Sequence, residues 1–207
     1  MNLLEITAST RVEGSVSRSL SRQFINAWLE SHPDTYHSFR DVGVNPPAHL
    51  NARFLEAMTT QSSEQTPEMA EILAESNALV KELLAADRIV IATPMYNFSI
   101  PSTLKAYIDN VVRSGLTFGY DPETAGFTGL AKGKRALVIL SAGGNYFGDS
   151  PAAVMDYATT YLKTILGFIG ITDVTVVTVP SQAGPKDVRE QTTARAADQL
   201  LSLATTW

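Results

Sequence analysis

Residues 88–101 read RIVIATPMYNFSIP, and this stretch decides the fold. Its first half is a short, continuous apolar run, which is typical of a strand buried on both faces of a parallel sheet. Its second half is an aromatic, amide-bearing loop between two prolines, and a helical pattern begins near Ser102. Open α/β sheets bind ligands where a strand ends and a helix begins. The stretch therefore predicts both a sheet and a ligand site at its edge.

The rest of the chain alternates between apolar runs of strand length and helical periodicity. Strands are expected at Leu3–Ala8, Thr35–Asp41, Arg88–Thr93, Arg135–Leu140 and Val174–Val179. Helices are expected at Ser17–Ser31, Met69–Ala86, from Ser102, at Pro151–Gly167 and at Lys186–Ala204, with irregular segments at Gly43–Thr66 and Gly115–Gly133. This alternation predicts an α/β fold: a flavodoxin-like, doubly wound, five-stranded parallel sheet of order 2-1-3-4-5, with helices on both faces.

Composition narrows the class of protein. A chain of 207 residues with 44% hydrophobic residues fits a single domain over residues 1–207. Its net charge of −5, without a block of like charges, argues against nucleic acid as a partner. The absence of cysteine excludes disulfides and thiol nucleophiles, and no metal site is expected. No signal-peptide pattern or apolar run of membrane-spanning length is seen, which predicts a cytoplasmic protein without a membrane partner.

A loop rich in hydroxyl groups follows the first expected strand. It carries Ser9, Ser15 and Ser17 just before a helix, whose N-terminus offers unpaired N–H groups to an anion. It lacks the glycine triplet of dinucleotide sites, so a single terminal phosphate suits it better. Serine is also an ordinary capping residue, and capping alone stays open as the alternative.

Two more loops are expected at the same edge, because parallel strands end together. In the loop after residue 93, Met95, Tyr96 and Phe98 supply apolar walls, and Asn97 supplies a donor and an acceptor. The loop after the fourth expected strand contains Gly143 and Gly144, which let the backbone approach a ligand closely. An ordinary glycine turn has the same sequence pattern and stays open as the alternative. A phosphate site, a flat aromatic slot and a glycine loop together indicate one FMN per chain.

The chain resembles the FMN-dependent NADH:quinone oxidoreductases, also called azoreductases, over nearly its whole length. The matching pieces are Ser9 with Ser15-Val16-Ser17, Pro94-Met95-Tyr96-Asn97-Phe98, Ser141-Ala142-Gly143-Gly144 and Leu166–Ile171. Ala142 stands where some relatives carry Arg. The resemblance implies that NADH or NADPH reduces FMN, which then reduces a quinone or an azo compound, and that the enzyme is a homodimer.

The resemblance also implies a set of site residues. Because hydride chemistry belongs to FMN, no catalytic side chain is assigned. The cofactor-binding residues implied are Ser9, Ser15, Val16, Ser17, Met95, Tyr96, Asn97, Phe98, Ser141, Ala142, Gly143 and Gly144. Asn97, Tyr120, Phe127 and Tyr146 are expected to face substrate, with aromatic residues of the 115–133 segment roofing the pocket.

Two other functions remain open from the residues. A flavodoxin-like electron carrier would dock on protein partners without its own substrate pocket, and a flavin-free binding protein would share the fold. The three histidines, His32, His37 and His49, fall outside the site loops and are expected to face solvent.

Overall fold

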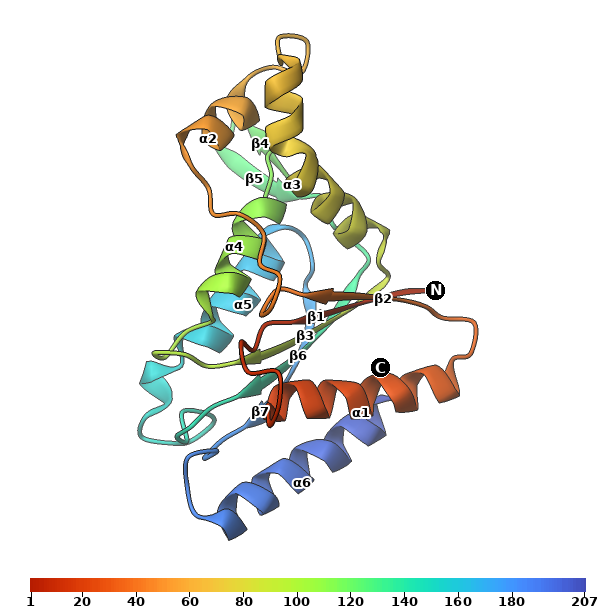
Figure 1. The fold of residues 1–207 in the computed structure, drawn as a ribbon, viewed down its shortest axis with the longest axis vertical. Helices are drawn as coiled ribbons and strands as arrows, with labels where there is room; N and C mark the ends of the chain where they lie inside the picture. Colours follow the sequence, from red (N-terminus) through yellow and green to blue (C-terminus); the bar gives the residue numbers. More distant parts are fainter.

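The computed structural model describes residues 1–207 and is built around one parallel sheet (Figure 1). Its strands are β1 (Asn2–Thr7), β2 (Tyr36–Asp41), β3 (Arg88–Pro94), β6 (Arg135–Ser141) and β7 (Asp173–Val179). They lie in the order β2-β1-β3-β6-β7, and every pairing is parallel. Counted within this sheet alone, the order is 2-1-3-4-5, as the sequence predicted.

Helices cover both faces of the sheet, which confirms the doubly wound arrangement (Figure 1). One face carries α1 and α6, and the other carries α3, α4 and α5. The bounds are α1 (Val16–Ser31), α3 (Pro67–Ala85), α4 (Ser102–Val111), α5 (Tyr157–Phe168) and α6 (Lys186–Leu203). No helix combines the length and apolarity needed to cross a bilayer.

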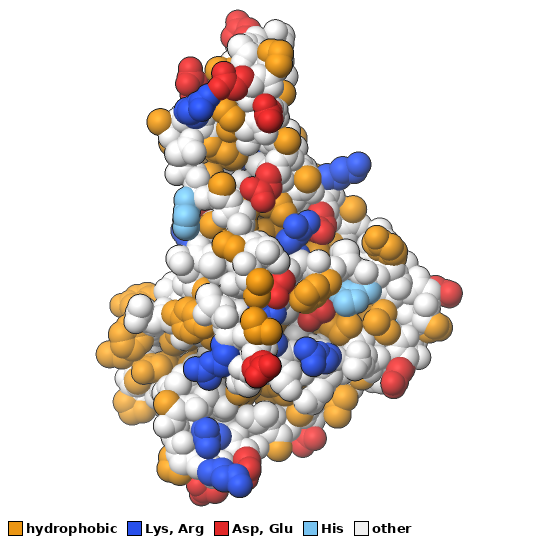
Figure 2. Space-filling view, in the orientation of Figure 1, with side chains coloured by type: hydrophobic (Ala, Val, Ile, Leu, Met, Phe, Trp, Pro, Cys, Tyr) orange, Lys and Arg blue, Asp and Glu red, His pale blue; other side chains and the backbone are white.

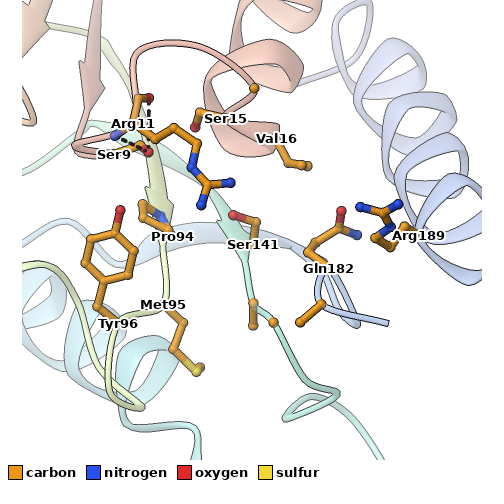
Figure 3. Close-up of a pocket in the computed structure, with 14 residues that line it drawn as sticks. Ser9, Arg11, Ser15, Val16, Pro94, Met95, Tyr96, Ser141, Gln182 and Arg189 are labelled. Atoms are coloured by element: carbon orange, nitrogen blue, oxygen red, sulfur yellow. Dashed lines mark hydrogen bonds between the residues drawn. The ribbon is translucent and has the colours of Figure 1, made fainter. Parts of the chain in front are cut away.

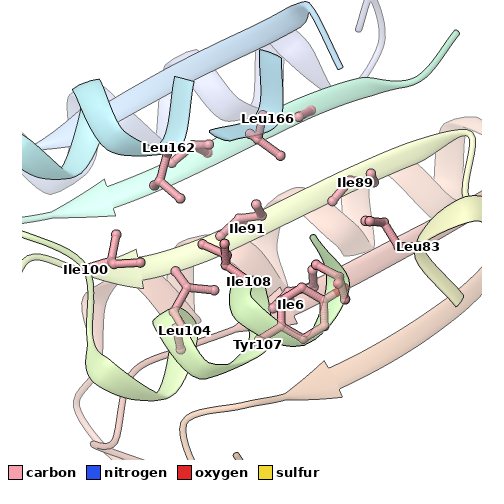
Figure 4. Packing of buried hydrophobic residues seen from close by; sticks show 14 of the residues in the cluster. Ile6, Leu83, Ile89, Ile91, Ile100, Leu104, Tyr107, Ile108, Leu162 and Leu166 are labelled. Carbon is pink, nitrogen blue, oxygen red and sulfur yellow. The ribbon is translucent and has the colours of Figure 1, made fainter. Parts of the chain in front are cut away.

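The central strand β3 shows why its sequence is apolar without interruption. Val90 and Ala92 pack under α1 and α6, whereas Ile89 and Ile91 belong to the cluster under α3, α4 and α5 (Figure 4). Successive side chains of a strand point to opposite faces, so a strand covered on both sides must be apolar at every position. Burying each of these aliphatic side chains contributes about 1.5–3 kcal/mol.

Two segments expected to be irregular contain regular structure. Helix α2 (Ala52–Thr59) lies within 43–66, where Asn51 caps it by accepting from the Phe54 amide at 3.0 Å. Phe54 and Ala57 then pack on Leu73 of α3. A hairpin of β4 (Phe118–Asp121) and β5 (Gly126–Gly129) occupies the other segment. The helix expected from Pro151 begins only at Tyr157, because Asp156 caps the Thr159 amide at 2.9 Å after a 3₁₀ turn.

The hairpin lies at the amino edge of the sheet, at the opposite end of the strands from the expected ligand site, so its aromatic residues do not roof the site of their own chain. Helix α4 returns the chain from the carboxyl end of β3, and β6 starts at Arg135, beside Arg88 at the start of β3. Both ends of the intervening segment are therefore at the amino edge. The Phe127 ring packs there on Phe168, with centroids 5.5 Å apart.

Candidate cofactor-binding site

A cavity of about 290 Å³ opens at the carboxyl edge of the sheet (Figure 3). The loops after β1, β3 and β6, which the sequence singled out, all line it, and the loop after β7 joins them. The lining residues are Ser9, Arg11, Gly14, Ser15, Val16, Pro94, Met95, Tyr96, Ser141, Ala142, Gly143, Gln182, Ala183 and Arg189. Of the cofactor-binding residues expected, Ser17, Asn97, Phe98 and Gly144 do not line the cavity. Ser17, Asn97 and Gly144 each follow a lining residue directly in the chain, whereas Phe98 is two residues from Tyr96.

The N-terminus of α1 supplies the anion-favouring end of the cavity. Ser15 is the N-cap and accepts from the Arg18 amide at 3.5 Å, and its hydroxyl lies 3.4 Å from that of the fully buried Ser17. The amides of Val16 and Ser17 have no intrahelical acceptor, as is usual at a helix start. The first turn carries no acidic side chain, so its partial positive charge is not neutralised.

A partly buried ion pair fixes this loop in place. Arg18 donates to both carboxylate oxygens of Asp41 at 2.7 and 2.6 Å, to the Ser9 carbonyl at 2.5 Å and to Thr7 Oγ1 at 3.0 Å. Asp41 also accepts from the Gly43 and Val44 amides at 3.1 Å. Burial alone would raise the pKa of Asp41, but the hydrogen bonds and charge of Arg18, with these amides, outweigh it and lower the pKa.

Gly43 is required where β2 leaves the sheet beside this pair. A Cβ at that position would lie 2.6 Å from the Ser9 carbonyl carbon and 2.8 Å from Arg18 Nη2. Because the first of these neighbours is backbone, it cannot move aside cheaply. The loop after β1 therefore depends on a close backbone approach from β2 as well as on Arg18.

The loop after β3 is a tight turn with an unusual backbone. Tyr96 and Ser99 exchange two hydrogen bonds of 2.9 and 3.0 Å, and the residues between them, Asn97 and Phe98, have φ of 48° and 69°. Two consecutive positive φ angles define a type I′ turn, which Asn tolerates well and Phe does not. Met95 is buried and belongs both to the core and to the cavity wall.

The glycine loop after β6 is held by the loop after β7. Ala142 and Gly143 carbonyls accept from the Gln182 and Ala183 amides, both at 2.9 Å. A Cβ on Gly144 would lie 2.8 Å from the ring of Tyr146, so glycine makes room for that ring. Tyr146 in turn packs edge-on against Phe98, with centroids 5.4 Å apart, beside the cavity and outside its lining.

Two arginines that the sequence analysis did not single out line the cavity. Arg11 and Arg189 are exposed, form no ion pair, and point their guanidinium groups toward the cavity (Figure 3). No carboxylate lines it. The sequence could have indicated the part of the site near Arg189. All strands of a parallel sheet end at the same edge, so the loop after the fifth strand must also lie there.

The histidines take no part in this site. His32 stacks on Trp28 with centroids 3.9 Å apart, and His37 Nε2 lies 3.1 Å from Glu5 Oε2. His32 and His37 are half-buried, and each has a structural role against a buried partner, whereas His49 is exposed. No group of three or more His, Asp or Glu side chains is placed to hold a metal ion.

The cavity suits a ligand with an anion at one end and a flat ring at the other. Hydroxyls, a helix start and two guanidinium groups attract the anion, while Met95, Tyr96 and loop peptide groups border the other end. A volume of about 290 Å³ is at the lower limit of cofactor sites, which usually occupy about 300–1,000 Å³. The residues that line the cavity therefore fit FMN by their chemistry.

Comparison with known proteins agrees with this reading. Residues 1–203 match the family described as flavodoxin-like fold. An FMN-dependent NADH:quinone oxidoreductase of Nostoc punctiforme is 42% identical over 207 residues, which cover both chains completely. Another, of Azotobacter vinelandii, is 42% identical over 202 residues, 98% of each chain.

Solved structures give the same result. An azoreductase of Bacillus anthracis strain Sterne superposes with a TM-score of 0.91 at 26% identity, over all of both chains. An FMN-dependent NADH-azoreductase of Bacillus anthracis strain Ames Ancestor, solved in complex with FMN, gives 0.85 at 28% identity, over 98% of this chain and 99% of that one. The chain thus belongs to the FMN-dependent NADH:quinone oxidoreductases, a family with the flavodoxin-like fold.

Proposed function

We propose that this chain is a single FMN-binding domain that oxidises NADH or NADPH and reduces quinones and azo compounds. The observation that carries the proposal is that one cavity at the sheet edge joins an anion-favouring helix start and an aromatic turn. Bound FMN supplies the hydride chemistry, accepting a hydride and passing two electrons on. The protein binds the cofactor, orients it and limits access of water.

The phosphate end is assigned to the loop after β1. Ser9 and Ser15 offer hydroxyls, and the Val16 and Ser17 amides offer N–H groups at the start of α1. Ser17 is buried behind Ser15, so its hydroxyl acts by orienting that of Ser15. Arg18 acts indirectly by fixing the Ser9 carbonyl.

The ring end is assigned to the turn after β3 and the loop after β6. The amides of Asn97, Phe98, Gly143 and Gly144 donate to no group of the chain, so they are free to donate to the polar edge of a flavin. The assigned segments are Met95–Phe98 and Ser141–Gly144. Tyr96 Oη lies 3.2 Å from Thr10 Oγ1 and so ties the two ends of the site together.

We propose a homodimer on the basis of an apolar surface beside the cavity. Tyr96, Phe98, Met155 and Tyr157 are 38–60% exposed, and Val154 is 78% exposed. Figure 2 shows the hydrophobic surface that gathers at the lower left of the molecule, where the loops after β3 and β6 lie. A contiguous surface of this kind marks an interaction site. Tyr157 lies on it, whereas Leu162 of the same helix is in the core.

In the proposed homodimer, Tyr120 and Phe127 of the β4–β5 hairpin would contact the site of the second copy. They are 51% and 59% exposed on the hairpin, away from their own chain's cavity. The hairpin of a second copy is proposed to roof the open side of the site. Sedimentation of the FMN-loaded protein at micromolar concentration should then give twice the chain mass of 22.4 kDa. A monomer that accumulates a semiquinone would instead support the electron carrier.

The reductase activity is tested by adding NADH to the FMN-loaded protein without oxygen. The flavin absorbance should bleach, and a quinone or an azo dye added next should restore it. Repeating the experiment with NADPH identifies the preferred donor. Failure to bleach with either donor would reject the reductase, and a protein that binds no FMN would reject the flavin site as well.

Asn97 is tested with a pair of variants. Asn97→Gly removes the side-chain amide but still adopts a positive φ easily. Asn97→Ala removes the side-chain amide and also disfavours the positive φ. We expect both to weaken FMN binding or turnover by about five- to tenfold, the worth of one hydrogen bond. Only Asn97→Ala should also lose about 1 kcal/mol of folding stability. If Asn97→Gly behaves like the parent protein, Asn97 serves the turn alone.

A further inference from the structure

A second cavity, of about 600 Å³, lies between α2, α3 and the turn after α4. These elements are at the upper part of the molecule in Figure 1. The cavity shares no lining residue with the cofactor cavity and nothing in the proposed reaction uses it. Its lining includes a buried arginine, Arg113, at the end of α4.

Arg113 is the only buried arginine of the chain and is 6% exposed. Its Nη1 donates to Ser76 Oγ at 2.5 Å, and its guanidinium lies over the Phe54 ring at 5.6 Å. Its Nε is buried without an acceptor, and no carboxylate lies within ion-pair distance. Nη2 forms no hydrogen bond within the chain and is not a buried atom, so it is the N–H group left to face the cavity that Arg113 lines.

An unpaired buried cation is unusual, because removing a charge from water costs several kcal/mol unless a counter-charge is present. Burial also lowers the pKa of Arg113, which shows the same cost. Lys81 of α3 lines the same cavity and has no ion-pair partner, whereas no Asp or Glu lines it. Two cations thus share one cavity without a counter-charge.

The remaining wall determines what kind of anion would enter. Leu73, Val80 and Leu116 contribute apolar surface, and Asn77 contributes an amide. We propose that this cavity binds a small organic anion, whose carboxylate, sulfonate or phosphate group lies at Arg113 and Lys81 and whose apolar body packs on these side chains. The free guanidinium nitrogen of Arg113 and the ammonium group of Lys81 are both hydrogen-bond donors without acceptor capacity, so an oxyanion suits them.

The test is calorimetric titration of the FMN-loaded protein, in which the flavin site is filled. The probes are naphthalene-2-sulfonate and its neutral analogue naphthalene-2-sulfonamide. We expect saturable binding of the sulfonate, with the sulfonamide at least about tenfold weaker because it lacks the charge. Absence of saturable sulfonate binding, or equal binding of both probes, would overturn the proposal.

Variants place the site. Lys81→Glu reverses an exposed charge on the cavity wall and should weaken sulfonate binding about tenfold. Lys132→Glu reverses an exposed, unpaired lysine outside the cavity and should leave the affinity unchanged within about twofold. Arg113→Met should weaken sulfonate binding at least tenfold. A thermal unfolding scan first establishes that this variant folds. If Lys81→Glu and Lys132→Glu bind the sulfonate equally well, the probe binds elsewhere and the assignment fails.

Discussion

Ser15→Asp is expected to weaken FMN binding about 100-fold or more and to leave α1 intact. Asp caps a helix as well as Ser does, and its charge favours the helix N-terminus. The same charge opposes a phosphate bound at the Val16 and Ser17 amides. Two unit charges about 4 Å apart repel by about 4 kcal/mol at an effective dielectric constant of 20, which is nearly a thousandfold in affinity. Salt and water reduce this figure to about 100-fold.

Two controls separate the charge from the shape of the loop. Ser15→Asn caps the helix without a charge and should bind FMN within about tenfold of the parent protein. Riboflavin, which lacks the phosphate, should bind all three proteins alike. Flavin fluorescence on titration reports both ligands. An equal loss for riboflavin and FMN would indicate a distorted loop, and unchanged FMN affinity would leave Ser15 as a cap only.

The sheet could be predicted because the apolar run of each strand indicates both its local structure and its burial between two layers of helices. The middle of β3 is apolar without interruption since both its faces are covered, and the run is shorter than a usual helix, which favours a strand. Right-handed crossovers and short connections then leave few strand orders, and for five strands the flavodoxin-like order is the simplest. These rules act on the backbone, so a single sequence is enough to apply them.

The elements that the sequence did not predict are those that depend on tertiary contacts. Helix α2 has eight residues, and its apolar residues make sense only beside Leu73 of α3. The β4–β5 hairpin has four-residue strands with half-exposed aromatic residues that pack on Phe168. Short, isolated helices and hairpins are marginal in water, so local sequence carries little signal for them.

The candidate site divides in the same way. Ser15, Met95 and Gly143 stand in loops directly after buried strands, and their place at the edge follows from topology. Gln182 and Arg189 reach the cavity because the loop after β7 bonds to the glycine loop, a contact that no periodicity reveals. Asn97 looked like a ligand contact by residue type alone, whereas its φ of 48° shows that the turn also requires it.

Arg18→Met is expected to cost about 3–5 kcal/mol of folding stability and to weaken FMN binding. The side chains of Arg18 and Asp41 are 10% and 18% exposed, and removing one partner leaves the other buried and unpaired. The Ser9 carbonyl also loses its donor, so the loop at the phosphate end loosens. Urea unfolding at pH 7 measures the loss. Arg22→Met, an exposed arginine one turn further along α1, is the matched control and should change stability by less than about 0.5 kcal/mol.

The dependence on pH distinguishes the ion pair from the other bonds of Arg18. Because the pKa of Asp41 is lowered in the folded protein, its contribution is complete above the ordinary Asp pKa of about 3.9. It is lost as the pH falls through the lower, folded value. The stability gap between the parent protein and Arg18→Met should thus be full at pH 7 and should narrow below about pH 4. A gap of the same size at both pH values would mean that the bonds to Ser9 and Thr7, and not the charge of Asp41, hold the loop.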